Sequence, residues 1–324
     1  MAKIRIGIVG YGNVGKGVEK AVIATGDMEL KAVFSQRDVA LLSLADKTVP
    51  VIPIAEAAKY KDKIDVMILC GGSANDLAEH GPRFAALFNT VDSYDVHAKI
   101  PEYIKSVDAA ASTTTAIISA GWDPGLFSLI RVLSESVLPD GESYSFWGHG
   151  VSQGHSNAIR AIEGVEDAVQ YTVPIEKAVD AARSGIRPQL SAREKHLREC
   201  YVVAKPNADK DKIEEIIKTM PDYFADYDTT VRFISNDEFN ENHKKMPHGG
   251  LVVRSGATGS NEHVIEYSLK LDSNPEFTGS VLVACARAVF RMSKEGNYGA
   301  KTLLDVPVSY LSPSDRMTLI SELM

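Results

Sequence analysis

The chain has 324 residues, 44% hydrophobic and 24% charged, which is enough for two globular domains with separate cores. Its formal net charge of −8 argues against non-specific nucleic-acid binding, which depends on lysine and arginine. The chain shows no membrane span, no signal peptide, and no cysteine or histidine spacing typical of a metal site or a disulfide framework, so we expect a cytoplasmic enzyme without a metal.

The first part of the chain alternates strands and helices. A β-branched run at 3–10 predicts a strand, and residues 13–25 predict a helix with valines on one face. Further strands are expected at 28–35, 49–54, 64–72 and 89–95, and helices at 54–61, 75–88 and 101–112. This alternation predicts a Rossmann-type, doubly wound parallel sheet over residues 1–121.

From residue 122 onward the strands become longer and the crossover helices fewer, which predicts an α+β second domain over 122–296. A long helix at about 275–294 is expected to begin with Asn274 as its cap and Pro275 at its first turn. The C-terminal segment, about 297–324, is a candidate to return to the first domain.

A glycine-rich turn joins the first strand to the first helix. It has the pattern GxGxxG, in which the glycines allow a tight turn, close approach of a pyrophosphate and close contact between helix and strand. The helix N-terminus adds free N–H groups for the anion. The expected dinucleotide-binding residues here are Gly10, Tyr11, Gly12, Asn13, Val14 and Gly15.

The end of the second strand bears on the choice of cofactor. An acidic residue there would accept the ribose hydroxyls of NAD, but the residues are Ser35, Gln36 and Arg37. A hydroxyl and a guanidinium suit the 2′-phosphate of NADP, so NADP is favoured. The alternative is that Arg37 is an ordinary loop charge and that Asp38 serves NAD.

A second cofactor loop is expected after the fourth strand, at Cys70, Gly71, Gly72 and Ser73. Cys70 lies near the crevice where ligands of such sheets bind. A nucleophilic role would require a lowered pKa, and no neighbour in the sequence provides one. We therefore expect Cys70 to be structural.

Seven stretches, in order along nearly the whole chain, resemble the meso-diaminopimelate dehydrogenases. They are VDSYDVHAKIP at 91–101, SAGWDPGLFS at 119–128, FWGHGVSQGHSNAIR at 146–160, AVQYTVP at 168–174, TMPDYF at 219–224, MPHGG at 246–250 and LKLDSNPEFT at 269–278. The resemblance implies NADP-dependent, reversible oxidative deamination at the D-centre of meso-2,6-diaminopimelate, giving L-2-amino-6-oxopimelate and ammonia on the route to lysine. It also implies a homodimer and a second domain for substrate binding and dimerisation.

The resemblance assigns the reacting D-centre amine to two carboxylates, Asp95 after the fifth strand and Asp123 in GWDP. Either of them, directly or through water, is the expected general base. Considered alone, Asp123 before Pro124 is typical of a helix cap, and Asp95 is typical of a turn at the end of a strand.

Polar residues of the second domain are assigned by the same resemblance to the distal L-centre. Thr172, Arg198 and His248 would bind its carboxylate, with Asn274 nearby. Without the resemblance, Thr172 would be an ordinary β-former, Arg198 one charge on a solvated helix SAREKHLRE, and His248 a turn residue.

Phe146 and Trp147 are matched to the wall around the methylene chain of the substrate, although a core tryptophan is an equal alternative. Gln153 and Gly154, with His155, are expected to form a loop that closes on the substrate. Two other interpretations are open. One is another NADP-linked Rossmann reductase, such as a dihydrodipicolinate reductase or a homoserine dehydrogenase. The other is a dinucleotide-sensing protein without turnover.

Overall fold

The structure is a computed structural model that describes residues 2–324, and it divides the chain into two compact units. The first unit comprises the chain up to Leu129 together with Pro275–Met324, and the second is Ile130–Asn274. Each unit is described separately below.

The first unit contains a seven-stranded sheet in the order β14-β6-β5-β4-β1-β2-β3, and all neighbouring strands pair in parallel. The strand order reverses between β1 and β4, so the expected doubly wound Rossmann sheet is confirmed. The strands are β1 (Ile4–Val9), β2 (Met28–Ser35), β3 (Val51–Pro53), β4 (Val66–Leu69), β5 (Asn89–Asp92), β6 (Thr115–Ile117) and β14 (Gly299–Lys301).

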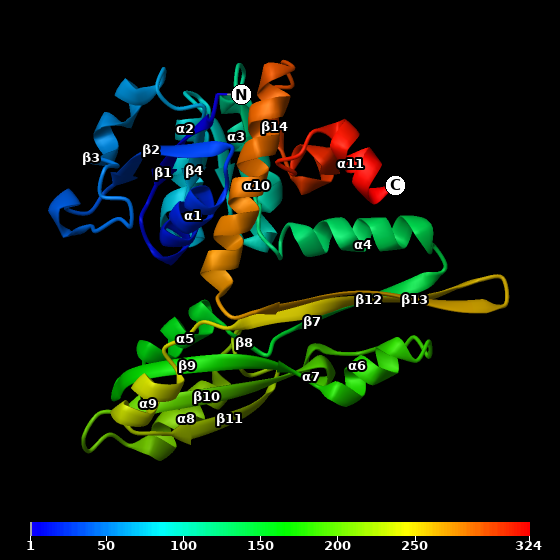
Figure 1. Cartoon of the computed structure of the whole chain (residues 1–324). Helices are drawn as coiled ribbons and strands as arrows, with labels where there is room; N and C mark the ends of the chain where they lie inside the picture. Colours follow the sequence, from blue (N-terminus) through cyan, green and yellow to red (C-terminus); the bar gives the residue numbers. More distant parts are fainter. Residues whose placement is uncertain (1) are drawn as a thin grey trace. The chain divides into compact units, whose positions relative to one another are not determined.

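Two apolar clusters bury the two faces of this sheet. On one face, α1 (Asn13–Ala24) and α10 (Asn274–Lys294) run beside each other (Figure 1) and pack on the isoleucines of β1. The other cluster includes residues of α2 (Ala78–Ala85) and α3 (Ile100–Ala110). Shorter elements of this unit are η1 (Val39–Leu41), η2 (Ile54–Tyr60), η3 (Ser73–Leu77), η4 (His97–Lys99), η5 (Leu303–Asp305), η6 (Val308–Tyr310) and α11 (Arg316–Leu323).

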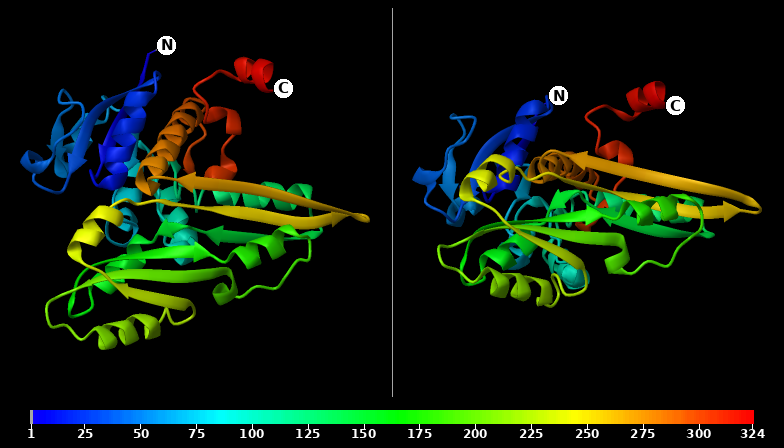
Figure 2. Two further views of the ribbon diagram at one scale, coloured as in Figure 1. Left: turned by 60° about the horizontal axis from the view of Figure 1, so that its bottom comes forward. Right: turned by 90° about the horizontal axis from the view of Figure 1, so that it is seen from below.

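The second unit has two sheets, a four-stranded one in the order β11-β10-β9-β8 and an antiparallel one in the order β13-β12-β7. Figure 2 shows the long β12–β13 hairpin from two further directions. This confirms the expected α+β architecture. The strands are β7 (Gly141–Trp147), β8 (Gly150–Val151), β9 (Val165–Pro174), β10 (His196–Ala204), β11 (Asp228–Phe233), β12 (His248–Thr258) and β13 (Asn261–Leu271). The helices are α5 (Gln153–Arg160), α6 (Glu176–Arg183), α7 (Ala192–Lys195), α8 (Lys210–Thr219) and α9 (Asn236–Asn242), while α4 (Leu126–Val137) contains the boundary between the units.

The expected domains were 1–121 and 122–296, whereas the first unit extends to Leu129, resumes at Pro275 and includes the C-terminal segment 297–324. Helix α10 belongs with the Rossmann sheet, because its apolar side chains are buried almost all round and form part of the core that also contains β1 and α1. The closest approach of α1 and α10 is at two glycines: a Cβ on Gly279 would lie 2.5 Å from the carbonyl carbon of Gly17. The pattern of the helix in the sequence carries no information about this long-range partner.

Several elements of the first unit are shorter than expected or differ in type. Strand β5 ends at Asp92 rather than residue 95, since the Asp92 carboxylate accepts the N–H of Tyr94 and takes it out of strand pairing. The expected helix at 54–61 is a 3-10 helix, and the one at 75–88 begins as a π-helical turn and ends at Ala85. Within residues 2–324, no helix is both long and apolar enough to cross a bilayer.

Candidate active site

A pocket of about 340 Å³ lies at the carboxyl ends of β1, β2 and β4, where a doubly wound sheet binds its ligands. Nine of the thirteen expected cofactor residues line it. They are Gly10, Tyr11, Gly12, Ser35, Gln36, Arg37, Cys70, Gly71 and Gly72. Asn13, Val14, Gly15 and Ser73 are not among its lining residues, and Val9, Ile54, Asp76 and His80 line it in addition.

The glycines of the turn have distinct roles. Gly10 has a φ of +87°, which other residues rarely adopt, and a Cβ on Gly15 would lie 2.4 Å from the Gly10 carbonyl oxygen. At Gly12 no atom lies within 4 Å of the Cβ position, so the backbone is open to a ligand. Helix α1 starts at the next residue without a side-chain cap and without an acidic residue in its first turn. This end of the helix therefore suits a pyrophosphate.

The residues after β2 fit a phosphate better than ribose hydroxyls. The Arg37 guanidinium donates to the carbonyl oxygen of Tyr11, and the Arg37 N–H donates to Ser35 Oγ at 2.9 Å. Both side chains are thereby held at the pocket. The carboxylate of Asp38 instead accepts the N–H of Ala40 and caps η1, and Asp38 does not line the pocket. The alternative in which Asp38 serves NAD therefore has no support.

Cys70 lines this pocket, and its surroundings do not favour a nucleophilic thiolate. Burial raises the pKa of its thiol well above the ordinary value, and its Sγ lies 3.9 Å from the carbonyl oxygen of Ile68. The neutral thiol packs as a small apolar group, as expected from the sequence.

His80 was missed by the sequence analysis. It is buried on α2, 44 residues after Gln36, and its Nε2 lies 3.0 Å from the Gln36 amide nitrogen, while its Nδ1 has no hydrogen-bond partner. A histidine inside a helix, distant in sequence from the glycine-rich turn, gives no signal of this proximity.

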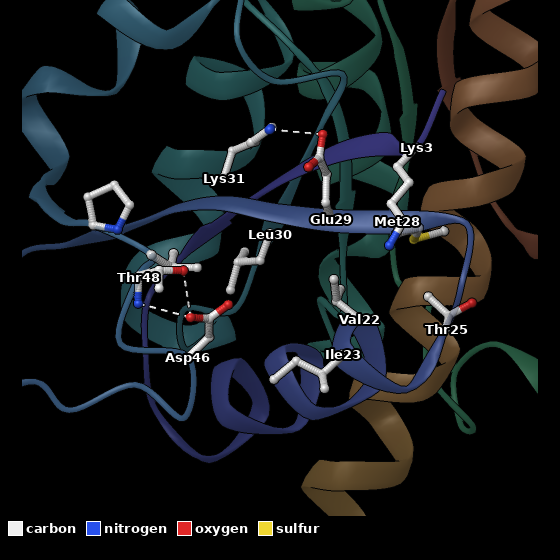
Figure 3. Close-up of a pocket in the computed structure, with 12 residues that line it drawn as sticks. Lys3, Val22, Ile23, Thr25, Met28, Glu29, Leu30, Lys31, Asp46 and Thr48 are labelled. Atoms are coloured by element: carbon white, nitrogen blue, oxygen red, sulfur yellow. Dashed lines mark hydrogen bonds and ion pairs between the residues drawn. The ribbon is translucent and has the colours of Figure 1, made fainter. Parts of the chain in front are cut away.

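A larger pocket of about 440 Å³ lies at the opposite ends of β1 and β2 (Figure 3). Two pairs of its polar groups bind each other: Lys31 with Glu29 at 2.8 Å, and Thr48 Oγ1 with Asp46 at 2.7 Å. It also lacks a glycine-rich turn, and so it is not the dinucleotide site.

The two expected carboxylates of the first unit lie on loops at the carboxyl ends of β5 and β6. Asp95 is three residues beyond β5, and its N–H donates to Ser73 Oγ at 3.1 Å, which ties this loop to the second cofactor loop. Asp123 precedes α4, but the helix begins at Leu126 and the Asp123–Pro124 peptide is cis. Pro124 is therefore not the first residue of α4.

In the second unit, Arg198 and Thr172 are neighbours on β10 and β9. The two residues are paired across the strands, and the Arg198 Nη1 donates to Thr172 Oγ1. Arg198 is only 7% exposed, and the guanidinium lies 3.9 Å from the centre of the Tyr227 ring. The interpretation of Arg198 as a charge on a solvated helix is wrong, because α7 ends at Lys195 and β10 begins at His196.

His248 lies in the same neighbourhood. Gly150 pairs with Thr172, and a Cβ on Gly150 would lie 2.5 Å from the His248 ring. Burial lowers the pKa of His248, whose Nδ1 accepts the N–H of Gly249 at 2.8 Å. Because Nδ1 accepts this bond, the proton of the neutral imidazole is on Nε2, which can donate a hydrogen bond to a ligand.

Phe146 and Trp147 end strand β7 and face opposite sides of it. Phe146 is fully buried in the core formed with α6 and β12, so its ring does not line an open wall. Trp147 is 37% exposed and stacks on His196, with 5.3 Å between ring centres. The backbone N–H of Trp147 donates to His196 Nε2 at 2.9 Å. Trp147 is therefore not an ordinary core residue.

Gln153 and Gly154 begin helix α5, which corrects the expected loop conformation of this segment. The Gln153 amide nitrogen lies 3.1 Å from Met246 Sδ, and the Asn274 N–H donates to the Met246 carbonyl at 3.0 Å. The segment around Met246 thus brings Gln153, Asn274 and His248 together. Tyr227, whose ring lies against the Arg198 guanidinium, was not among the predicted site residues. In the described residues, no group of three or more His, Cys, Asp or Glu side chains could hold a metal.

Together, the Rossmann sheet, the pocket at its switch point and the polar cluster of the second unit define a dinucleotide-linked dehydrogenase. Comparison with known proteins gives the family. Residues 121–273 match the model of the diaminopimelic acid dehydrogenase C-terminal domain. The chain is 58% identical to a meso-diaminopimelate D-dehydrogenase of Lysinibacillus sphaericus, over 100% of both chains.

Solved structures agree with this assignment. The chain resembles the Corynebacterium glutamicum DAP dehydrogenase in complex with DAP, with a TM-score of 0.93, 45% identity and 100% of each chain covered. It also resembles an engineered D-amino acid dehydrogenase bound to NADP⁺, with a TM-score of 0.87, 43% identity and 100% of each chain covered. The chain belongs to the meso-diaminopimelate D-dehydrogenase family.

Proposed function

We propose that this protein catalyses the NADP-dependent, reversible oxidative deamination of the D-centre of meso-2,6-diaminopimelate to L-2-amino-6-oxopimelate and ammonia, a step in lysine biosynthesis. The observation that carries the proposal is Arg198. It is a buried cation, and no carboxylate in the described part of the chain forms an ion pair with it. Burial lowers the pKa of its guanidinium, and its Nε has no partner.

A buried charge without a counter-ion is costly, and a ligand carboxylate would remove this cost. The contrast with the two other buried arginines is informative. Arg254 donates to the carbonyl oxygens of Leu138 and Pro139, and Arg287 pairs with Asp27. Among the described residues, Arg198 contacts the Thr172 hydroxyl and the Tyr227 side chain, but no carboxylate. We therefore assign Arg198, Thr172 and His248 to the distal L-centre carboxylate, with Gln153 and Asn274 beside them.

The reacting D-centre amine is assigned to Asp95 and Asp123. As carboxylates they attract an ammonium group, and one of them, directly or through water, takes the proton that must leave nitrogen before the C–H bond can be broken. NADP⁺ supplies the hydride acceptor when it is bound. The imine that forms on the substrate is hydrolysed by water, which releases ammonia. Trp147 offers an apolar face and an indole N–H to the methylene chain.

The proposal is tested by incubating the purified protein with NADP⁺ and meso-diaminopimelate and following NADPH absorbance, in parallel with the LL and DD isomers. Turnover of the meso isomer, with little or none of the LL isomer, is expected because LL has no D-centre. The DD isomer has a D-centre at both ends. Its rate relative to the meso isomer therefore measures how strongly Arg198, Thr172 and His248 select the L-configuration at the distal centre. No NADPH with the meso isomer would refute the proposed reaction and would leave the dinucleotide-sensing alternative.

The resemblance to the family also supports a homodimer in the cytoplasm. Light scattering coupled to size-exclusion chromatography should then give twice the chain mass of 35.1 kDa. A mass of one chain at working concentrations would contradict the dimer.

A further inference from the structure

One buried carboxylate has no place in the mechanism above. Asp92, the last residue of β5, is 1% exposed and accepts three hydrogen bonds. Its Oδ1 accepts the N–H groups of Tyr94 at 2.9 Å and Ser119 at 3.0 Å, and its Oδ2 accepts the Tyr103 hydroxyl at 2.7 Å. Its backbone carbonyl accepts a fourth bond, from Ala120 N–H at 2.8 Å.

These bonds join two loops that are distant in sequence. Tyr94 precedes Asp95, and Ser119 and Ala120 lie just before the turn that carries Asp123. Ser119 has a φ of +52°, in the left-handed region that residues other than glycine rarely adopt, so its conformation requires support from its surroundings. The Asp92 carboxylate provides this support through the Ser119 N–H.

Tyr103, which donates to Asp92 Oδ2, is itself fixed by packing. Its ring stacks on Tyr94 with 4.0 Å between centres, and its hydroxyl lies where a side chain on Gly81 would collide with it. The tyrosine pair and Asp92 therefore form one packed unit beneath both loops.

We propose that Asp92 is a positioning residue that sets the separation and direction of the two proposed catalytic carboxylates, Asp95 and Asp123. This inference rests on the proposed function. Asp92 itself is buried and does not touch the substrate. It acts by holding the loop 93–96 and the segment 119–123 in register. Because reacting groups must be placed within a fraction of an ångström, loss of this link should affect turnover much more than cofactor binding.

The test compares three variants. Asp92→Ala removes all three side-chain bonds and should lower kcat/KM for meso-diaminopimelate by about a hundredfold, with the Kd for NADP⁺, measured by fluorescence, changed less than about twofold. Asp92→Asn should restore most of the activity, because its oxygen can accept both N–H groups while its amide nitrogen donates to the Tyr103 hydroxyl. Tyr103→Phe keeps the ring stack, removes one bond and should give a smaller loss, of about three- to tenfold.

The matched control is Asp27→Ala, which removes another aspartate with several hydrogen bonds in the same unit, including its pair with Arg287. It should lower Tm without lowering kcat/KM. Unchanged kcat/KM in Asp92→Ala would overturn the proposal, and so would equal losses in the Asn and Ala variants, which would indicate that the charge is what matters. If Asp92→Ala does not fold, Tyr103→Phe is the test. Full activity in that folded variant would also contradict the positioning role of Asp92.

The Asp95→Asn and Asp123→Asn variants separate this inference from the proposed function. If either keeps wild-type activity, the catalytic assignment fails, whatever Asp92 does. If both lose activity and Asp92→Ala does not, only the positioning role fails.

Discussion

Arg198 is the residue whose environment most directly suggests a ligand, because its buried charge has no carboxylate partner and its Nε has no hydrogen-bond partner. Replacing it by methionine should lower kcat/KM for meso-diaminopimelate about ten- to a hundredfold, since a charge-assisted contact of this kind contributes roughly 1.5–3 kcal/mol. Simple D-amino acids with uncharged tails should lose much less, as they have no distal carboxylate. The measurement is the ratio of the two kcat/KM values.

A control for this variant is available on the adjacent helix. Arg193→Met removes an exposed arginine whose ion pair with Asp228 is open to solvent. It should leave kcat/KM unchanged for both substrates. Equal losses for both substrates in Arg198→Met, with the control unaffected, would mean that Arg198 supports the structure of the sheet and does not read the substrate.

Arg37 is the proposed cation for the 2′-phosphate of NADP, as Arg198 is for the substrate carboxylate. Arg37→Ala should raise the KM for NADP⁺ about tenfold or more and change that for NAD⁺ little, because only NADP⁺ carries the 2′-phosphate. Steady-state kinetics with both cofactors measure this. Arg316→Ala, an exposed residue of α11, controls for the loss of one positive charge. An unchanged preference in Arg37→Ala would show that other groups select the cofactor.

His196 links the stability of the fold to pH. Burial, followed by the charge of Arg198, lowers its pKa to about 4, so its Nε2 is neutral at pH 7 and accepts the Trp147 N–H. In the unfolded chain the pKa is about 6.5. Between these values the unfolded state binds more protons, and stability therefore falls as pH decreases from 6.5 to 4.

Protonation of His196 should lower the free energy of unfolding by about 3 kcal/mol at most. Urea denaturation at pH 7 and pH 5 would detect part of this decrease. In His196→Gln the difference between the two pH values should shrink. A difference as large as that of the wild type would assign the pH effect to other groups, of which His155, with its pKa also lowered to about 4 by burial, is the first candidate.

At the level of elements, the crossing of α1 and α10 depends on two glycines facing each other. Gly279→Ala places a methyl 2.5 Å from the backbone of Gly17, and overpacking of this kind costs about 1–3 kcal/mol. Gly26→Ala is the matched control, because nothing lies within 4 Å of its Cβ position. Urea unfolding should show a loss only in the first variant. If Gly279→Ala were as stable as Gly26→Ala, α1 and α10 could move apart to accommodate the methyl group without a loss of free energy of unfolding.

For the molecule as a whole, we expect NADP⁺ to stabilise the fold by mass action, by about 2.7 kcal/mol at a hundred times its Kd. Hydrogen exchange should locate this effect in the peptides that line the cofactor pocket, at 9–12, 35–37 and 70–72. Peptides at 28–31 and 46–50, which line the larger pocket of Figure 3, serve as the control. Protection confined to these control peptides would contradict the assignment of the site.

The sequence by itself determined the features that depend on local pattern. The alternation of strands and helices is a local pattern, and it sufficed to predict the Rossmann sheet. The GxGxxG turn, the residues that end the second strand and the loop after the fourth strand are also short-range features, and they predicted nine of the pocket residues. The polar residues of the second unit came from matched motifs and not from any periodicity.

Tertiary structure alone decided the features that depend on partners distant in sequence. These include the place of α10 in the first unit, the strand conformation and burial of Arg198, His80 beside Gln36, and Asp92 between two loops. The physical reason is the same in each case. Burial and hydrogen bonding bring together residues 26 to more than 200 positions apart, and local propensity carries no information about such contacts.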